Sequence, residues 1–364
     1  MMKRDKLLLA LSIGLFSFII SVTRLNARTD GGGALIQGHL RASSPHAPVI
    51  INGNSELGAY PGITGNGTLG NPYIIADWDI DAGSSGPCIE IRNTDMYVTI
   101  TNCTVTNSVS NYSVIKVVNG SNVNILGNNV TGNYGIYLNS SNNNTISGNN
   151  VTNSYYKGIC LSSSSNNTIS GNNVTYSYNE GIFLAYSSNY NTISGNNLVD
   201  NGWMGIHLHY SNNNLLSGNN VVDNDWRGIY LASSSNNNIS GNNVSGNDDD
   251  GVHVEYHSNY NTFSRNNVTG NSWNGFYLGS SSNGNVILNN TIFNNALACI
   301  YMSFDSQDNN INSNDMVDGC IEIEEGSVPQ GLSIKDVVIP VLFIITEFVA
   351  FSIILLKKKK SKKQ

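Results

Sequence analysis

Residues 144–150 have the sequence NTISGNN, and the same seven residues return unchanged at 167–173 and 191–197. Altered copies begin at seven further positions, namely Val98, Val123, Asn214, Asn237, Asn261, Gly284 and Asn309. Successive copies start 21 to 25 residues apart. A nearly fixed period of this length is typical of stacked copies of one structural unit, so the sequence predicts a solenoid.

The apolar positions of the repeat indicate the type of solenoid. The third heptad position is apolar in every copy, and the eighth is apolar in all but one, where Thr291 is the exception. A second apolar pair, such as Ile136 and Leu138, follows each heptad. This alternation predicts about three short strands per copy, separated by Gly, Asn and Ser corners. We therefore expect an all-β fold, a parallel β-helix of about ten to eleven coils stacked about 4.8 Å apart.

Asparagine fills the sixth heptad position in nine of the ten copies, and Cys103 is the exception. These residues are Asn128, Asn149, Asn172, Asn196, Asn219, Asn242, Asn266, Asn289 and Asn314. Identical amides stacked in register can form a hydrogen-bonded ladder, and asparagine tolerates the left-handed backbone of a sharp corner. We interpret this column as structural.

The coils of the form N-x-I-S-G-N-N-V followed by G-I-x-L resemble the NosD-like family of surface proteins, also described as CASH repeats. The resemblance covers Ile89 to about Ile323, and the segment from Gly62 to Ile75 is similar to the leading cap of archaeal members. It implies a right-handed parallel β-helix. It also implies a copper association, since NosD is implicated in copper delivery to a reductase. The same repeats occur in lyases, epimerases and adhesins, so the resemblance does not determine the chemistry.

The two ends of the chain predict its location. Basic residues precede an apolar run from Leu7 to Val22, which predicts a signal peptide over residues 1–27. Residues 337–356 are apolar enough to cross a bilayer, and the lysine-rich tail, residues 357–364, is expected on the cytoplasmic side. Between them we expect an N-terminal segment and cap (28–75), the repeats (76–325) and a linker (326–336). The predicted protein is a single-pass cell-surface protein with an extracellular β-helix.

Charge and sequons agree with a surface domain. Residues 31–333 contain six basic and twenty-one acidic residues, although the net charge of the whole chain is only −7. Such a surface disfavours nucleic acid as a partner. Asn-x-Ser/Thr sequons occur at fourteen places, which predicts a glycoprotein modified at a subset of them.

Five cysteines are too few for a disulfide framework, but pairs can still form outside the membrane. Cys299 and Cys320 occupy the Gly position of successive coils, which predicts Cα atoms about 4.8 Å apart, within the disulfide range. Cys88 and Cys103 form a second candidate pair in the first coil. Cys160 points outward and has no candidate partner.

Aromatic residues gather at two outward columns of the later coils. Trp203, Trp226 and Trp273 stand two residues before the G-I-x-L strand, and Tyr230 and Tyr277 lie within it. Aromatic faces suit the apolar faces of sugar rings, so these five residues are candidates for carbohydrate binding. The alternative is that they only shield the sheet and support coil pairing.

Two further sets of side chains suggest other chemistry. Asp225 and Asp248 fall in one column of adjacent coils, and paired carboxylates are what glycosidases use, so they are the candidate catalytic residues. His207 and His209 emerge on one face of a strand, and with His253 they are candidate ligands for copper or zinc. The sequence itself requires no cofactor.

The sequence therefore favours an extracellular module that recognises a polysaccharide, a cell-surface glycan or a surface protein, more readily as a binder than as an enzyme. The alternatives are a scaffold or adhesin with no small ligand, a polysaccharide-acting hydrolase, lyase or epimerase, and a NosD-like copper-associated protein.

Overall fold

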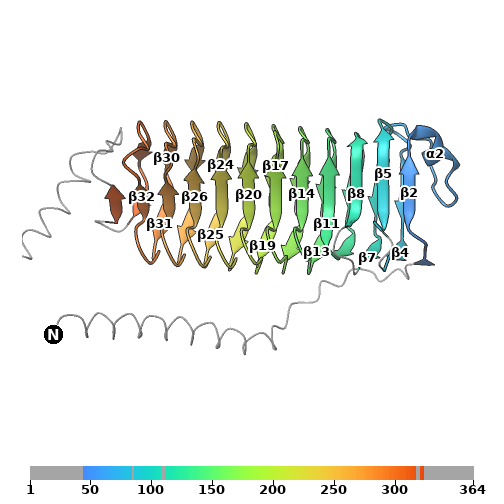
Figure 1. The fold of residues 1–364 in the computed structure, drawn as a ribbon, viewed down its shortest axis with the longest axis horizontal. Coiled ribbons are helices and arrows are strands. Elements are labelled where there is room, and N and C mark those ends of the chain that lie inside the picture. Colours follow the sequence, from blue (N-terminus) through green and yellow to red (C-terminus); the bar gives the residue numbers. More distant parts are fainter. Residues whose placement is uncertain (1–43, 84–85, 108–111, 317–319, 324–364) are drawn as a thin grey trace, which may run out of the picture. The chain divides into compact units, whose positions relative to one another are not determined.

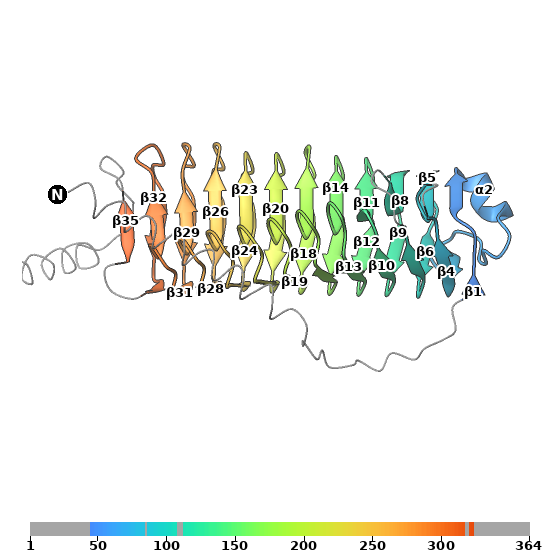
Figure 2. The same ribbon diagram turned by 60° about the horizontal axis from the view of Figure 1, so that its bottom comes forward.

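The computed structural model describes residues 44–83, 86–107, 112–316 and 320–323, and these residues form a parallel β-helix. Figure 1 and Figure 2 show the coils stacked side by side along one axis, with the chain advancing by one coil per repeat. The predicted all-β parallel solenoid is confirmed.

Three parallel sheets make up the walls. The 12 strands of sheet A are β1 (Ser44–Pro45), β4 (Trp78–Asp81), β7 (Thr104–Thr106), β10 (Asn129–Thr131), β13 (Asn150–Thr152), β16 (Asn173–Thr175), β19 (Asn197–Val199), β22 (Asn220–Val222), β25 (Asn243–Ser245), β28 (Asn267–Thr269), β31 (Thr291–Phe293) and β34 (Asp315–Met316). The 12 strands of sheet B are β2 (Val49–Asn52), β5 (Ile89–Thr94), β8 (Ser113–Gly120), β11 (Tyr134–Asn139), β14 (Ile159–Ser162), β17 (Ile182–Ala185), β20 (Ile206–His209), β23 (Ile229–Ala232), β26 (Val252–Glu255), β29 (Phe276–Leu278), β32 (Ile300–Met302) and β35 (Ile321–Ile323). The 11 strands of sheet C are β3 (Tyr73–Ala76), β6 (Val98–Thr101), β9 (Val123–Leu126), β12 (Thr145–Ser147), β15 (Thr168–Ser170), β18 (Thr192–Ser194), β21 (Leu215–Ser217), β24 (Asn238–Ser240), β27 (Thr262–Ser264), β30 (Val286–Leu288) and β33 (Asn310–Asn312).

Every coil contributes inward apolar side chains at the same positions. Ile146 pairs with Ile169 in sheet C, and Val151 pairs with Val174 in sheet A. These four side chains are fully buried. Because like residues stack on like, each coil extends one continuous apolar core, and burial of this core is the main contribution to the stability of the fold.

The heptad predicted to begin at Gly284 is shifted by one residue. Phe263 pairs with Ile287, not with Val286, and Val268 pairs with Ile292. The copy therefore begins at Asn285, and Thr291 is not a polar exception in the core because Ile292 occupies the inward position. A one-residue slip moves every side chain of a strand to the other face, so burial of the isoleucines fixes the register.

The sixth-position asparagines form a ladder inside the corner between sheets C and A. The Asn196 Nδ2 donates to Asn219 Oδ1 at 2.9 Å and to the Ile169 carbonyl at 2.9 Å. The next amides repeat this pattern through Asn242, Asn266 and Asn290. The ladder is confirmed, with Asn290 in place of the predicted Asn289. Because the amides are almost fully buried, each stacked side chain satisfies polar groups that water cannot reach.

The left-handed residue of this corner is the one before each ladder asparagine. Gly195, Gly218 and Gly241 have φ between 62° and 64°, whereas the ladder asparagines do not have positive φ. The expectation that the ladder residues themselves adopt the left-handed backbone was wrong. The fifth-position glycine turns the chain, and the asparagine that follows fills the corner.

The β-helix begins earlier than residue 76. The strands β1 and β2 already pair in register with β4 and β5. The helix α2 (Asn54–Ala59) covers the first coil, and its Leu57 is fully buried in the core. Leu57 therefore shields apolar groups that the first coil would otherwise expose.

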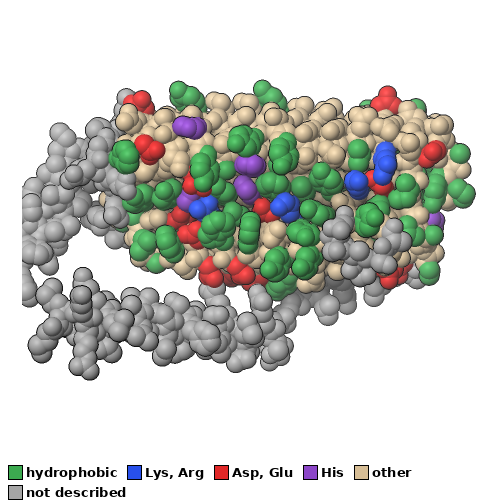
Figure 3. Space-filling view, in the orientation of Figure 1, with side chains coloured by type: hydrophobic (Ala, Val, Ile, Leu, Met, Phe, Trp, Pro, Cys, Tyr) green, Lys and Arg blue, Asp and Glu red, His purple; other side chains and the backbone are tan. Residues whose placement is uncertain are grey.

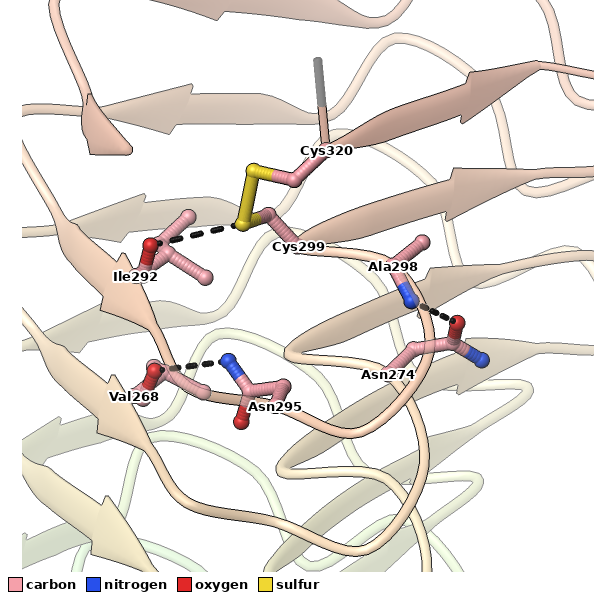
Figure 4. Close-up of a disulfide and its surroundings, with 7 residues drawn as sticks. All are labelled: Val268, Asn274, Ile292, Asn295, Ala298, Cys299 and Cys320. Atoms are coloured by element: carbon pink, nitrogen blue, oxygen red, sulfur yellow. Dashed lines mark hydrogen bonds between the residues drawn. A yellow bond between two sulfur atoms is a disulfide. The ribbon is translucent and has the colours of Figure 1, made fainter. Parts of the chain in front are cut away.

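A disulfide joins Cys299 and Cys320, whose Cα atoms are 5.0 Å apart (Figure 4). It links the corner before β32 to the start of β35, the final strand described. The Sγ of Cys299 lies 3.4 Å from the Ile292 carbonyl oxygen. Cys299 stands where Gly275 stands one coil earlier, as expected from the repeat.

Cys88 and Cys103 are not paired with each other. Cys88 immediately precedes sheet B, whereas Cys103 lies between sheets C and A, so the two thiols face different corners. The Cys88 thiol donates to the Thr106 carbonyl at 3.0 Å. Burial raises the pKa of each thiol to about 11. The proposed second disulfide is therefore replaced by two buried thiols.

The predicted signal peptide (1–27), linker (326–336), membrane span (337–356) and basic tail (357–364) lie outside the described residues. Within the described part of the chain, no helix is both long and apolar enough to cross a bilayer.

Candidate functional site

The outer face of sheet B carries aromatic and charged side chains that the repeat does not explain. One column of this face consists of Tyr137, Cys160, Phe183, His207, Tyr230, His253, Tyr277 and Tyr301. Some neighbouring rings of the column stack, with His207 and Tyr230 at 4.6 Å and His253 and Tyr277 at 4.2 Å between centroids, whereas Tyr230 and His253 meet edge to face. Figure 3 shows hydrophobic, histidine and charged side chains in a band across the face. We call the column from Tyr137 to Tyr301 the floor.

The predicted tryptophans line one edge of the floor. Backbone hydrogen bonds link Trp226 to Trp203, Asp249 to Trp226, and Trp273 to Asp249, so these residues stand in adjacent coils. The three indoles are 37% to 54% exposed. Their spacing follows directly from the repeat, and they present apolar ring surface to solvent. We call this column the tryptophan edge.

Tyrosines that were not predicted from the sequence line the opposite edge. Tyr186, Tyr210 and Tyr256 follow the ends of β17, β20 and β26, and all three are more than half exposed. The sequence signal that could have identified them is their position directly after the strand in each coil. Together with the tryptophan edge they flank the floor on both sides. We call this column the tyrosine edge.

Tyr230 differs from the exposed aromatics because it is buried in the floor. Its ring stacks on His207 and lies 4.5 Å from the Arg227 guanidinium. Its hydroxyl donates to the Glu255 carboxylate. Burial and this carboxylate raise the pKa of Tyr230 far above its ordinary value. Tyr230 supports its neighbours and has no free ring face for a sugar, whereas Tyr277 is partly exposed.

A buried carboxylate organises the middle of the floor. Glu180 accepts a 2.6 Å hydrogen bond from the Lys157 ammonium and lies 3.3 Å from His207 Nδ1. Burial opposes ionisation of Glu180, but the hydrogen bond from His207 and the Lys157 charge outweigh it and lower its pKa to about 2. Burial lowers the pKa of His207, against the effect of Glu180. Lys157 also lies 4.3 Å from the Phe183 ring centroid.

Arg227 joins two carboxylates further along the face. Its Nε lies 3.3 Å from Asp249 Oδ2, and its Nη1 lies 3.5 Å from Glu255 Oε1. Burial and the neighbouring Asp250 raise the pKa of Asp249. Burial also acts against ionisation of Glu255, but His253 beside it, the hydrogen bond from Tyr230 and the Arg227 charge lower its pKa to about 2. The pKa values of the two carboxyl groups are therefore shifted in opposite directions.

His253 lies between two carboxylates. Its Nδ1 is 2.7 Å from Asp250 Oδ2, and its Nε2 is 3.3 Å from Glu255 Oε2. Asp250 is itself held by Asn274, whose backbone N and Nδ2 donate to Asp250 Oδ1 at 2.9 and 2.8 Å. These bonds fix the imidazole in one orientation.

Arg227, His253 and the carboxylates that they contact border a groove of about 740 Å³. We call it the acidic groove, and its charged lining consists of Arg227, Asp248, Asp249, Asp250 and Glu255. Trp226, Trp273, Tyr277 and Tyr301 supply its aromatic walls. Of the two predicted catalytic residues, Asp248 borders this groove. Asp225 occupies the same column one coil earlier and is not part of the lining.

A second groove, of about 560 Å³, lies nearer the N-terminal end of the same face. We call it the basic groove, because Arg92, Lys116 and Lys157 line it together with Glu90. Glu90 is buried and pairs with Arg92 at 2.7 Å and with Lys116 at 3.0 Å. Four of the five Lys and Arg residues in the described part of the chain thus line the two grooves of sheet B.

The histidines predicted as metal ligands lie on this face, but they are not brought together as a ligand set. The ring centroids of His207 and His209 are 5.8 Å apart, and His253 is held by Asp250 and Glu255. Across the residues the structure describes, no group of three or more His, Cys, Asp and Glu side chains could hold a metal ion. Copper or zinc binding stays a prediction.

The family model for the right handed beta helix region matches residues 87–229 and 190–316. The A-module of the mannuronan C-5 epimerase AlgE4 from Azotobacter vinelandii is 13% identical with a TM-score of 0.56, over 71% of this chain and 90% of that one. The AlgE6 A-module from the same organism is 14% identical with a TM-score of 0.58, over 79% and 89%. Dettilon tailspike protein (gp208) is 17% identical with a TM-score of 0.59, over 77% of this chain and 61% of its own. At these identities the likeness shows the fold alone. No curated protein matches the sequence.

Proposed function

The chain belongs to the right-handed β-helix family, and from that premise we propose that it binds a polysaccharide along the outer face of sheet B. One observation carries the proposal: exposed aromatic residues line both edges of a floor that contains grooves with charged and polar side chains. Sugar rings stack their C–H faces on aromatic rings, and their hydroxyl groups hydrogen-bond to polar side chains. A polymer suits this face because the same columns repeat over several coils.

The comparisons support the class of ligand. Two of the similar structures are named as epimerases of mannuronan, which is a polysaccharide. A β-helix hosts many activities, so this likeness supports a carbohydrate partner without assigning a reaction. Membership of the NosD-like subgroup is a separate prediction.

The test is retention of the full-length protein on immobilised neutral, acidic and basic polysaccharides. The double substitution Trp203→Ser/Trp226→Ser removes two rings of the tryptophan edge. Tyr260→Ser is the matched control, because Tyr260 is an exposed aromatic at the corner before sheet C. We expect retention on at least one polymer, lost in the double variant and kept in the control.

Retention on none of the polymers would contradict the proposal and favour the scaffold or adhesin. Equal retention of wild type and double variant would show that the tryptophan edge is not the contact surface. Each variant must melt at the wild-type temperature for either result to be used.

Cleavage of the bound glycan is a second candidate function. The pKa of Asp249 is raised, which is the direction that a general acid needs, and Glu255, with its pKa near 2, stays ionised. Both carboxyl groups contact the Arg227 guanidinium, so they lie close together on one groove, as the paired carboxyl groups of glycosidases do. New reducing ends released by wild type but not by Asp249→Asn would support it.

We also propose that this face lies outside the cell, with the chain anchored through residues 337–356. The basis is the sequence pattern alone. Digestion of intact cells with an external protease should remove the β-helix epitopes and spare an epitope placed after residue 364. Copper delivery remains an independent candidate, and copper retained after dialysis and lost in His207→Ala would favour it.

A further inference from the structure

We propose that the acidic groove selects a sugar that carries an ammonium group, so that the polysaccharide is one containing unacetylated amino sugars. This inference rests on the proposed function and specifies the ligand class of the same face. It concerns the segment between Trp226 and Tyr301 and leaves the basic groove aside.

The charge of the lining is the first argument. The acidic groove contains four carboxylates and a single arginine, whereas the basic groove contains three cationic side chains and one carboxylate. Arg227 is shared by Asp249 and Glu255 at 3.3 and 3.5 Å, which is longer than a well-formed charge-assisted hydrogen bond. The arginine therefore neutralises only part of the negative charge, and a uronate placed here would be repelled.

The titration of Asp249 points the same way. Burial and the Asp250 carboxylate raise its pKa, which means that the ionised form is poorly compensated. An ammonium group in the groove would supply the missing positive charge. A neutral N-acetyl group at the same place would supply no positive charge.

His253 provides a second and independent observation. Its side chain is 6% exposed, and its Nε2 has no hydrogen-bond partner among the described residues, since Glu255 Oε2 at 3.3 Å is not aligned for one. Nδ1 lies 2.7 Å from Asp250 Oδ2, so Nε2 is the ring nitrogen left to contact a ligand in the groove. A buried ring nitrogen without a hydrogen bond is unfavourable, and a sugar hydroxyl group, which can donate and accept, would satisfy it.

The aromatic wall completes the fit. Trp273 is about half exposed, and Tyr277 and Tyr301 stack at 5.2 Å beside it. An indole face attracts a cation as well as the apolar face of a sugar ring, so the same wall serves both parts of an amino sugar. Arg227 lies 4.3 Å from the Trp226 ring, so Trp273 is the more exposed of the two indoles in the groove.

The test compares three hexasaccharides binding to the full-length protein by calorimetry: glucosamine, N-acetylglucosamine and mannuronate. The first two differ only in the ammonium group. We expect the glucosamine hexamer to bind about tenfold more tightly than its acetylated form, and the mannuronate hexamer to bind more weakly than either, at low salt. Added salt should reduce the preference.

Asp249→Asn and Glu255→Gln each remove one negative charge from the groove, and Asp79→Asn removes one from an exposed position of strand β4. We expect the first two to lower glucosamine affinity about fivefold and leave N-acetylglucosamine affinity unchanged, and Asp79→Asn to change neither. Equal binding of the acetylated and unacetylated hexamers, or tighter binding of mannuronate, would overturn the inference while leaving the proposed function standing. If none of the hexamers binds and the protein is retained on no polysaccharide of the panel, both the inference and the proposed function are wrong.

Discussion

Tyr186, Tyr210 and Tyr256 adopt the left-handed backbone conformation, with φ of 52°, 49° and 57°. Other coils place serine at this corner, as at Ser163 and Ser233. A bulky side chain in this region is strained, and strain of this kind concentrates at functional sites. The tyrosines are exposed, so core packing does not explain them.

Replacing Tyr210 with asparagine tests whether the tyrosine edge is retained for binding. Asparagine tolerates positive φ, so Tyr210→Asn should raise the free energy of unfolding by about 0.5–1 kcal/mol and weaken retention on the polysaccharide. Urea denaturation and the retention assay measure the two effects. Tyr155→Asn is the control, because Tyr155 is also exposed but does not have positive φ. A stability loss in Tyr210→Asn would show that this tyrosine serves the fold.

Glu180 gives a pH-dependent prediction. Its folded-state pKa of about 2 lies below the unfolded value of about 4.5, so its contribution is present above pH 4.5 and is lost as pH falls toward 2. The contribution at neutral pH is about 3 kcal/mol on the pKa difference alone. Glu180→Gln should lower stability at pH 7 and flatten its decline between pH 4.5 and 2, as measured by urea denaturation. An unchanged slope in this interval would contradict the assignment.

The strands could be predicted from the sequence because each apolar column repeats with little change. The slip at Gly284 could not, since Val286 and Ile287 are both apolar and only stacking against Phe263 distinguishes them. Trp203, Trp226 and Trp273 were identified because corner residues stay at fixed offsets from the strand. The link between Arg227, Asp249 and Glu255 depends on side-chain orientation across adjacent coils, which spacing does not determine.

Neighbouring asparagines in one corner belong to two different ladders, one buried and one on the surface. Asn219 donates to the Ile193 carbonyl and to Asn242, and its carbonyl oxygen accepts from the backbone and side chain of Asn196. Asn220, which follows it, forms a ladder on the surface of sheet A and donates to Asn197 at 2.7 Å. Removing the buried amide leaves several polar groups without partners, whereas water replaces the partners of the surface amide.

We therefore expect Asn219→Ala to lower the free energy of unfolding by about 2–4 kcal/mol and Asn220→Ala by less than about 1 kcal/mol. Chemical denaturation of the two variants beside wild type measures the difference. Equal losses would mean that the buried ladder contributes little beyond what the surface ladder does.

At the scale of the whole molecule, a solenoid couples each coil mainly to its neighbours. A change at one end should therefore affect that end and fade over the next coils. The disulfide between Cys299 and Cys320 lies in the last coil described, and it closes a loop with a sequence separation of 21 residues. Its removal is a direct measure of how far coupling extends.

The double variant Cys299→Ser/Cys320→Ser should lose about 3 kcal/mol of protection in the final coils, the amount expected for a loop of this length. Amide hydrogen exchange should accelerate in β32 and β35 and stay at the wild-type rate in β20, which lies several coils away. Glycan retention should persist, because the tryptophan edge and most of the acidic groove lie in earlier coils. Uniform acceleration through β20 would instead show that the β-helix unfolds as one cooperative unit, and the disulfide would then stabilise the binding face as well as the end.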